Sequence, residues 1–172
     1  MKNNHKISCV ITLYNRQEFI NDAIECVMNQ SLKPHEIIII DNSSKKINIQ
    51  NRYLDEIKIF NIVPGAGIAQ ALNFGVSVAE GNYISFLEDD DIWPDNYLEN
   101  VYSEDYLKYD YIVTPIRKLK DGIISDYKNP KNKINLNTFL ISNPGVNISN
   151  LSIKKKSFFE VGGFDLDLIT SI

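Results

Sequence analysis

The chain is short of cysteine and histidine and has no excess of positive charge, and each shortage excludes a class of protein. Two cysteines among 172 residues do not make a disulfide framework, and Cys9 and Cys26 lie in apolar patterns typical of buried free thiols. This favours a cytosolic protein. His5 and His35 are isolated, with no metal-ligand spacing around them. A net charge of −4 gives no general basic surface, so nucleic acid is not an expected partner.

Long apolar runs are also missing. No segment approaches the length of a membrane span. The polar start, residues 1–6, is followed by apolar residues that Tyr14-Asn15-Arg16 soon interrupts, which is not the pattern of a secretory signal. The one basic run, Lys154-Lys155-Lys156, fits a solvated helix start as well as a contact with an anionic membrane. The expectation is a cytoplasmic protein, with peripheral association at the inner membrane surface left open.

What is present is an ordinary globular composition, with 44% apolar and 23% charged residues. Apolar runs of strand length alternate with stretches of helical spacing. The candidate strands are residues 7–13, 36–40, 57–63, 83–87 and 111–114, and the candidate helices are residues 17–29, 68–79 and 94–108. This order predicts an α/β fold with a mostly parallel central sheet flanked by helices.

The pattern changes after Thr114. Residues 117–137 are rich in Lys, Asn and Asp, with Asp121-Gly122 as a hairpin turn. A further strand is expected within residues 146–153, and a short helix over residues 157–161. No internal repeat or low-complexity linker interrupts the chain. We therefore expect one domain over residues 1–172, with two subregions, 1–114 and 115–172.

The acidic run Glu88-Asp89-Asp90-Asp91 directly follows the apolar run of residues 83–87. Four adjacent acidic side chains repel one another unless a positive charge lies between them. A divalent cation suits oxygen ligands, and Mg²⁺ completes its shell with water and substrate phosphates. The alternative is a plain helix start, because acidic residues and Pro94 both suit a first turn.

The polar residues that follow Leu13, Ile40 and Leu87 bear on this choice. In parallel sheets, ligands bind at the carboxyl ends of the strands. The three polar segments should therefore meet at one edge of the sheet and form a site.

Several short blocks of the sequence, in order, resemble the family 2 glycosyltransferases, which have the GT-A fold. Each block is weak alone, but the ordered set is specific and spans almost the whole chain. The blocks are Thr12–Arg16, Asn29–Ser31, Glu36–Ser44, Ala71–Gly75, Ala79–Ile84, the acidic run Glu88–Asp91 and Gly162–Asp165.

The resemblance implies an inverting, hexosyltransferase-like enzyme that uses a nucleotide-diphosphate sugar with Mn²⁺ or Mg²⁺. The acceptor would be a glycan or lipid-linked, in bacterial surface polysaccharide synthesis. Residues 1–114 would be the nucleotide-sugar-binding half and residues 115–172 a partial acceptor-side half.

The family pattern also implies roles for single residues. Thr12 and Tyr14 match positions that line the nucleobase and ribose pocket, and Asp41 matches the first of two acidic positions after the second strand. The second is Asn42 here, whose amide can still pair with a pyrimidine edge, so the donor is a UDP- or dTDP-sugar. Asn15 and Asn73, within matching blocks, are further candidates for nucleotide-sugar binding.

The acidic run corresponds to the family's Asp-x-Asp motif. Counted from the strand, Glu88 takes the first position and Asp90 the second, which makes Asp90 the expected metal ligand. Glu88 or Asp89 would then lie near the ribose. Counted from Pro94-Asp95, the register slides and Asp91 is also a metal candidate.

The general base that inverting transfer needs is not assigned. In the family it lies some residues beyond the Gly-Gly-Phe-Asp block, which here means beyond Ile172. Asp165 is a weak candidate for the acceptor side, because in the family it more often shapes the acceptor and donor-sugar pocket.

Competing interpretations remain at this point. Tyr14 suits a site or a core equally, Trp93 suits packing or sugar stacking, and Gly75 is best explained by close packing. At the level of function, the chain could be a fragment that binds a donor without turning it over, or a partner subunit of another transferase, since the base is expected to lie outside it. A nucleotidyltransferase is less favoured, because residues 12–17 have no Gly and one Arg.

Overall fold

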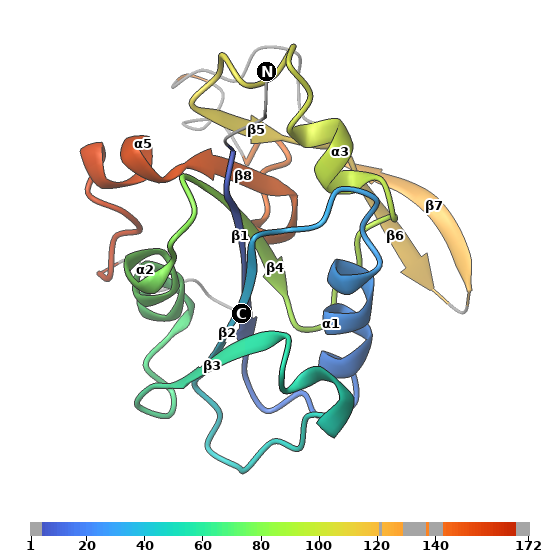
Figure 1. Cartoon of the computed structure of the whole chain (residues 1–172), viewed down its shortest axis with the longest axis vertical. Coiled ribbons are helices and arrows are strands. Elements are labelled where there is room, and N and C mark those ends of the chain that lie inside the picture. Colours follow the sequence, from blue (N-terminus) through green and yellow to red (C-terminus); the bar gives the residue numbers. More distant parts are fainter. Residues whose placement is uncertain (1–4, 121, 129–136, 138–142, 168–172) are drawn as a thin grey trace.

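A six-stranded sheet forms the centre of the molecule (Figure 1). The computed structural model describes residues 5–120, 122–128, 137 and 143–167. The strand order is β3-β2-β1-β4-β8-β5. The strands are β1 (Ile7–Leu13), β2 (Glu36–Asp41), β3 (Ile57–Asn61), β4 (Tyr83–Glu88), β5 (Tyr111–Val113) and β8 (Leu151–Lys154).

Strands β1 to β4 are parallel, which confirms the predicted sheet. β8 pairs antiparallel with β4, and β5 pairs antiparallel with β8. The register sets Thr12 of β1 beside Glu88 of β4, and Leu13 beside Asp41 of β2. The carboxyl ends of these strands therefore lie together at one edge.

Helices cover both faces of the sheet (Figure 1). One face packs against α1 (Ile20–Met28) and α3 (Tyr97–Val101), and the other packs against α2 (Ile68–Val78) and α5 (Lys155–Glu160). The run Ile37–Ile40 is buried on both faces, as expected for a covered parallel strand. Each fully buried side chain of this size contributes about 1.5–3 kcal/mol.

Gly75 shows how closely α2 approaches the sheet. A Cβ added there would lie 2.5 Å from Cγ1 of Val10. The structure therefore supports the packing explanation for this glycine.

The helix predicted over residues 94–108 is much shorter than expected, because only Tyr97–Val101 is helical. Ser103, Glu104 and Asp105 follow it. A serine that can bond its own backbone and two negative charges at the negative end of the helix dipole all oppose continuation. The prediction was wrong because it followed the apolar spacing alone.

The strand expected within residues 146–153 is also shorter. Residues Ile148–Asn150 form a 3-10 turn, and β8 begins at Leu151. The side-chain amide of Asn150 donates to the carbonyl oxygens of Thr114 and Gly145. These two carbonyl oxygens are therefore hydrogen-bonded by a buried side chain, at a place where the longer predicted strand would have used backbone N–H groups.

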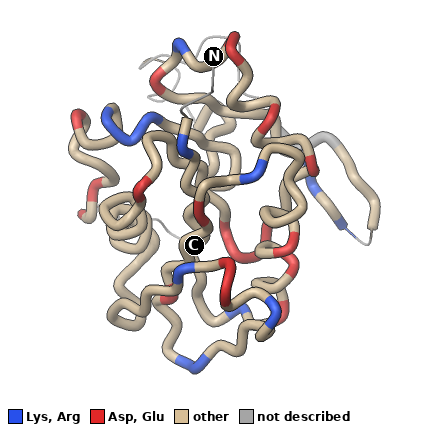
Figure 2. The backbone as a smooth tube through the Cα atoms, viewed as in Figure 1, with Lys and Arg blue, Asp and Glu red and all other residues tan. Residues whose placement is uncertain are grey.

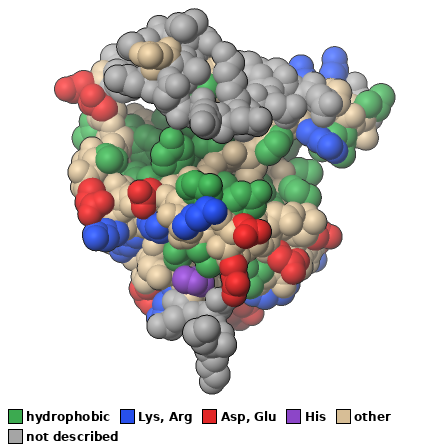
Figure 3. All heavy atoms as spheres, turned by 90° about the horizontal axis from the view of Figure 1, so that it is seen from above, with side chains coloured by type: hydrophobic (Ala, Val, Ile, Leu, Met, Phe, Trp, Pro, Cys, Tyr) green, Lys and Arg blue, Asp and Glu red, His purple; other side chains and the backbone are tan. Residues whose placement is uncertain are grey.

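A hairpin of β6 (Ile116–Lys120) and β7 (Ile123–Lys128) stands off the main sheet, at the right of Figure 1. Gly122 has φ 76°, which confirms the predicted turn, while Asp121 lies outside the described residues. Apolar and basic side chains lie side by side on the hairpin (Figure 3). Leu119, Ile123 and Ile124 are all exposed.

Candidate functional site

Three loops meet at the carboxyl edge of the parallel strands. The N–H of Tyr14, after β1, donates to Oδ2 of Asp89, after β4, at 2.9 Å. The N–H of Asn15 donates to Oγ of Ser43, after β2, at 2.8 Å. The predicted convergence of the segments after Leu13, Ile40 and Leu87 is confirmed.

Asn15 lies at the bend of the first of these loops. Its φ of 57° is left-handed, a conformation that asparagine tolerates better than most residues. Its side-chain Oδ1 accepts hydrogen bonds from the N–H and hydroxyl of Ser44, both at 3.1 Å. Asn15 thus fastens the β1 loop to the β2 loop with its backbone and its side chain.

Asp89 is the internal tie of the acidic run, which forms a continuous red segment in Figure 2. Its side chain is buried and accepts both the Tyr14 N–H and the Arg16 guanidinium, the latter at 2.9 Å. Burial raises the pKa of Asp89, although these two donors act in the opposite direction. Both oxygens of the Asp89 carboxylate are therefore used in contacts that hold the loops after β1 and β4 together.

Arg16 supplies the positive charge that the acidic run needs. Its Nη1 lies 2.9 Å from an oxygen of Asp89 and 2.9 Å from an oxygen of Asp90. The guanidinium is still 43% exposed. The sequence identified the need for a cation between these carboxylates, but it attributed that role to a metal ion and missed Arg16.

Glu88 is a half-buried carboxylate of the run. Its backbone N–H donates to Oγ of Ser149, but within the described part of the chain no donor reaches its carboxylate. Burial, together with the charges of Asp91 and Asp90, raises the pKa of Glu88 to about 7. A strongly raised pKa in a cluster of like charges is typical of a functional site.

Asp90 is exposed, and Asp91 is half-buried like Glu88. The Asp90 side chain is 38% exposed, and Arg16 contacts one of its oxygens. The Asp91 N–H donates to the carbonyl of Glu88 and closes the turn. No group of three His, Cys, Asp or Glu side chains among the described residues forms a ready metal cluster. Any metal here would complete its shell with other ligands.

The remaining nucleotide candidates lie on or beside the same strand ends. Thr12 is buried next to Glu88. Asp41 accepts the N–H of Ser43 at 2.9 Å, which shapes the loop after β2. Asn42 is buried, and its backbone bonds to Leu13 and Gly65.

The structure gives different environments to Tyr14 and Trp93, the two aromatic residues whose roles the sequence left open. Tyr14 is 47% exposed at the loop, so it is not a core residue. Trp93 is 5% exposed, stacks on Tyr97 and donates its indole N–H to the carbonyl of Ser149 at 2.8 Å. Trp93 is therefore a packing anchor and has no face free for a sugar.

Asn73 has a contact that the sequence did not predict. Its amide Nδ2 donates to the carbonyl of Phe164, and its Oδ1 accepts the N–H of Phe164. Direct contact with a nucleotide sugar stays a prediction for this residue. Asp165, next along the chain, is exposed and accepts the N–H of Asp167.

Gln30 is a further residue whose role the sequence missed. It is fully buried, and its amide donates to the carbonyls of Cys26 and Pro94 while accepting the N–H of Leu98. It thereby joins α1 to the segment that follows the acidic run. The available signal was a lone amide at the end of an apolar helix face.

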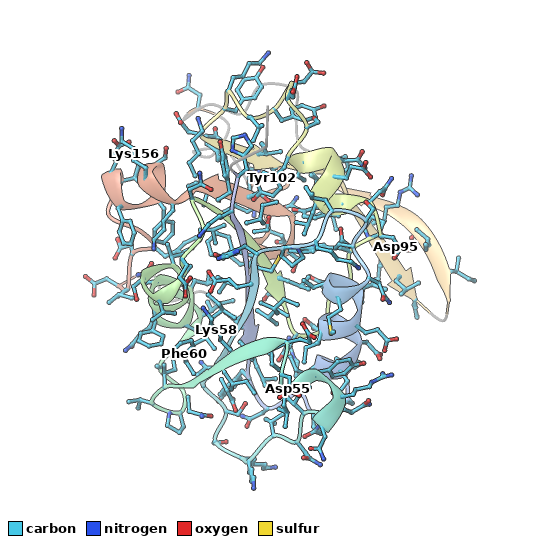
Figure 4. The ribbon with its side chains drawn as sticks, viewed as in Figure 1. Asp55, Lys58, Phe60, Asp95, Tyr102 and Lys156 are labelled. Carbon is cyan, nitrogen blue, oxygen red and sulfur yellow. The ribbon has the colours of Figure 1, made fainter. Side chains whose placement is uncertain are left out.

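The lysine run of residues 154–156 is partly engaged within the fold. Lys154 pairs with Asp110, and the Lys155 amine donates to the carbonyl of Ala79. The side chain of Lys156, labelled in Figure 4, is 85% exposed, and its Nζ lies 3.6 Å from Oε1 of Glu160. Among the helices of the described residues, none is long and apolar enough to cross a bilayer.

A mostly parallel sheet with helices on both faces and these loops at its carboxyl edge is the architecture of the GT-A fold. The chain belongs to glycosyl transferase family 2, whose family model matches residues 8–164.

Individual relatives are longer than this chain. An uncharacterized glycosyltransferase of Haemophilus influenzae is 37% identical over 98 residues, 54% of this chain and 39% of that protein. The minor teichoic acid biosynthesis protein GgaB of Bacillus subtilis is 31% identical over 123 residues, 66% of this chain and 14% of GgaB.

Solved structures share the fold. S. aureus TarS 1–349 in complex with UDP-GlcNAc superposes with a TM-score of 0.70 at 17% identity. The match covers 91% of this chain and 47% of that one. This chain thus spans less than half of each of these proteins.

Proposed function

We propose that this domain binds a UDP-sugar at the carboxyl edge of β1, β2 and β4 and presents it for inverting transfer to a glycan or lipid-linked acceptor. The observation that carries the proposal is the joining of three loops beside the acidic run: Asp89 holds the loop after β1, and Asn15 of that loop holds the loop after β2. The family membership supports the reaction class.

The chain's own residues divide the work of binding. Thr12, Tyr14 and Asp41 line the nucleotide end, and the Asn42 amide pairs with the pyrimidine edge. Uracil is preferred over thymine on the likeness to TarS, which has been solved with UDP-GlcNAc. Arg16 holds Asp89 and keeps a positive charge beside the site, where the negative diphosphate would lie.

The residues fit a Mn²⁺ or Mg²⁺ ion by the chemistry of their donors. Such ions need only one or two carboxylates when water and phosphate complete the shell, so a preformed triad is not required. Burial, and then the charges of Asp91 and Asp90, raise the pKa of Glu88, and a nearby cation would favour its charged form. Asp90 would hold the ion, with Asp91 as the second candidate. The ion would supply charge stabilisation to the departing diphosphate.

The wider role is the synthesis of a bacterial surface polysaccharide at the cytoplasmic face of the membrane. The relation to GgaB, a teichoic acid biosynthesis protein, supports a surface polymer. No residue of this chain is assigned as the general base, and the chain spans less than half the length of the relatives named above, so complete transfer is proposed only for a protein of their full length.

Isothermal calorimetry tests the proposal. We expect UDP to bind in the presence of Mn²⁺, more weakly without it, and more tightly than dTDP. Asp90→Ala should remove the Mn²⁺ dependence. Asp55→Ala, which changes an exposed aspartate on the loop before β3, is the matched control and should behave as wild type.

Three results would contradict this account. Failure of wild type to bind any nucleoside diphosphate would remove the donor site. Retained Mn²⁺ dependence in Asp90→Ala would move the metal ligand to Asp91. Tight donor binding with no hydrolysis or transfer by the whole protein would favour a binding module without turnover.

A further inference from the structure

The loop of residues 162–165 is fastened to α2 by a reciprocal pair of hydrogen bonds. The Asn73 amide donates to the Phe164 carbonyl at 2.8 Å and accepts the Phe164 N–H at 2.9 Å. The two residues are 91 positions apart. Figure 1 shows the segment after α5 descending beside α2. One side chain therefore joins the residues 1–114 subregion to the loop that carries Asp165.

Gly163 allows this contact to form. Its φ is 78°, and an added Cβ would lie 2.7 Å from Oδ1 of Asn73. Any larger residue would push the amide away from the Phe164 backbone. The glycine is thus explained by the approach of Asn73 as well as by the left-handed turn.

The Phe164 ring fixes the same loop relative to β4. Its centroid lies 5.8 Å from that of Phe86 and 5.5 Å from that of Phe158. Phe86 is two residues before Glu88 on β4. The loop is therefore held at two points, by the amide on α2 and by the ring beside the strand that ends in the acidic run.

The loop and Asn73 line an open hollow of about 570 Å³. Residues Val161–Asp167 form the rest of its wall, and both Asp165 and Asp167 are exposed. Carboxylate oxygens accept hydrogen bonds from hydroxyl groups, which a sugar has in number. The chemistry of this wall suits a polyhydroxyl ligand.

We infer that Asn73 is a positioning residue that sets the affinity for the sugar part of the donor through the Phe164 backbone, with Asp165 as the group it positions. The inference rests on the proposed function. A side chain of purely structural importance would change the binding of the whole donor. A positioning residue should leave the nucleotide part unaffected.

Calorimetry with UDP and with UDP-GlcNAc, both with Mn²⁺, separates these cases. Asn73→Asp keeps the acceptor for the Phe164 N–H but places an oxygen against the Phe164 carbonyl. We expect about tenfold weaker binding of UDP-GlcNAc, since one hydrogen bond becomes a repulsion, with UDP affinity unchanged. Ser77→Ala, four positions along the same helix, is the control and should change neither.

A double variant tests whether Asn73 acts through Asp165. Asp165→Asn should weaken UDP-GlcNAc binding to a similar extent, and combining it with Asn73→Asp should add little, because both changes affect one contact. Full additivity would overturn the inference.

The other outcomes are also decisive. Equal weakening of UDP and UDP-GlcNAc by Asn73→Asp, or wild-type binding of UDP-GlcNAc no tighter than UDP, would overturn the inference and leave the proposed function standing. Failure of wild type to bind UDP at all would overturn the proposed function, and the inference with it.

Discussion

The pKa values of two glutamates at opposite ends of the parallel strands, Glu36 at the amino ends and Glu88 at the carboxyl ends, shift in opposite directions. Glu36 begins β2 and accepts hydrogen bonds from the Ser8 hydroxyl, the N–H groups of Glu80 and Gly81, and the amine of Lys58. Lys58 lies on β3 and is labelled in Figure 4. Burial opposes its charge, but these donors outweigh that effect, and the pKa of Glu36 is lowered.

Glu88 ends β4, and burial and its acidic neighbours raise its pKa to about 7. The contrast shows that the fold can satisfy a carboxylate fully when that carboxylate serves stability. The carboxyl edge, where Glu88 is left without such donors, carries unbalanced negative charge that a ligand could offset.

The strongest test of the amino edge is Glu36→Ala. The change leaves the Ser8 hydroxyl and the Glu80 N–H without this acceptor and removes one of the two acidic partners of Lys58, which keeps Glu80. We expect a loss of about 2–3 kcal/mol in the free energy of unfolding, because buried donors lose their acceptor, and urea denaturation measures it. Removal of the exposed pair of Lys156 and Glu160, by Lys156→Ala, is the control and should cost less than about 1 kcal/mol. A similar small loss for Glu36→Ala would contradict the assignment.

Asp89→Ala should have the next largest effect, since Asp89 is the carboxylate of the acidic run that joins the loops after β1 and β4. It removes the acceptor of the Tyr14 N–H and leaves Arg16 with Asp90 alone. We expect a loss of about 2 kcal/mol in stability together with weaker UDP binding, because the loops after β1 and β4 separate. If stability falls and UDP affinity is unchanged, these loops do not form the nucleotide site.

A smaller effect is expected in the pH dependence of the free energy of unfolding, which tests the role of the Glu36 charge. A carboxylate with a lowered pKa stabilises the fold above its unfolded pKa of about 4.3, and this contribution is lost as pH falls through the folded pKa. The stability difference between wild type and Glu36→Gln should therefore shrink as pH falls below about 4. Urea midpoints at several pH values measure it, and a difference that stays constant into acid would contradict the role of charge.

Much of the sheet was predictable because its strands are continuous apolar runs. Ile37–Ile40 and Ile84–Leu87 are short, mostly apolar runs typical of strands covered on both faces, and the alternation with helices orders them. The convergence of the polar loops followed from that parallel order. The length of α3 did not, because Ser103 and the acidic residues after it acted against the apolar spacing.

The pairings within the site were beyond a reading of the sequence. Arg16 reaches Asp89 across 73 positions, and Asn73 reaches Phe164 across 91. Such contacts depend on where the loops come to lie, and no local spacing encodes them. The buried role of Glu36 could not be predicted either, because a glutamate at the start of a strand is usually solvated. Its contacts with Ser8 and Gly81 become visible only in the structure.

The most direct test of the contrast measures stability and ligand response on the same two variants. Urea midpoints of wild type, Glu36→Gln and Glu88→Gln should be recorded with and without Mn²⁺ and UDP. A ligand at one hundred times its Kd stabilises by about 2.7 kcal/mol.

We predict that Glu36→Gln loses stability but keeps the full gain on adding ligand. Glu88→Gln should gain on the order of 1 kcal/mol without ligand, because a partly buried negative charge is removed from an acidic cluster, and should show a smaller ligand gain. A Glu88→Gln protein that is less stable than wild type, with its ligand gain intact, would contradict the account.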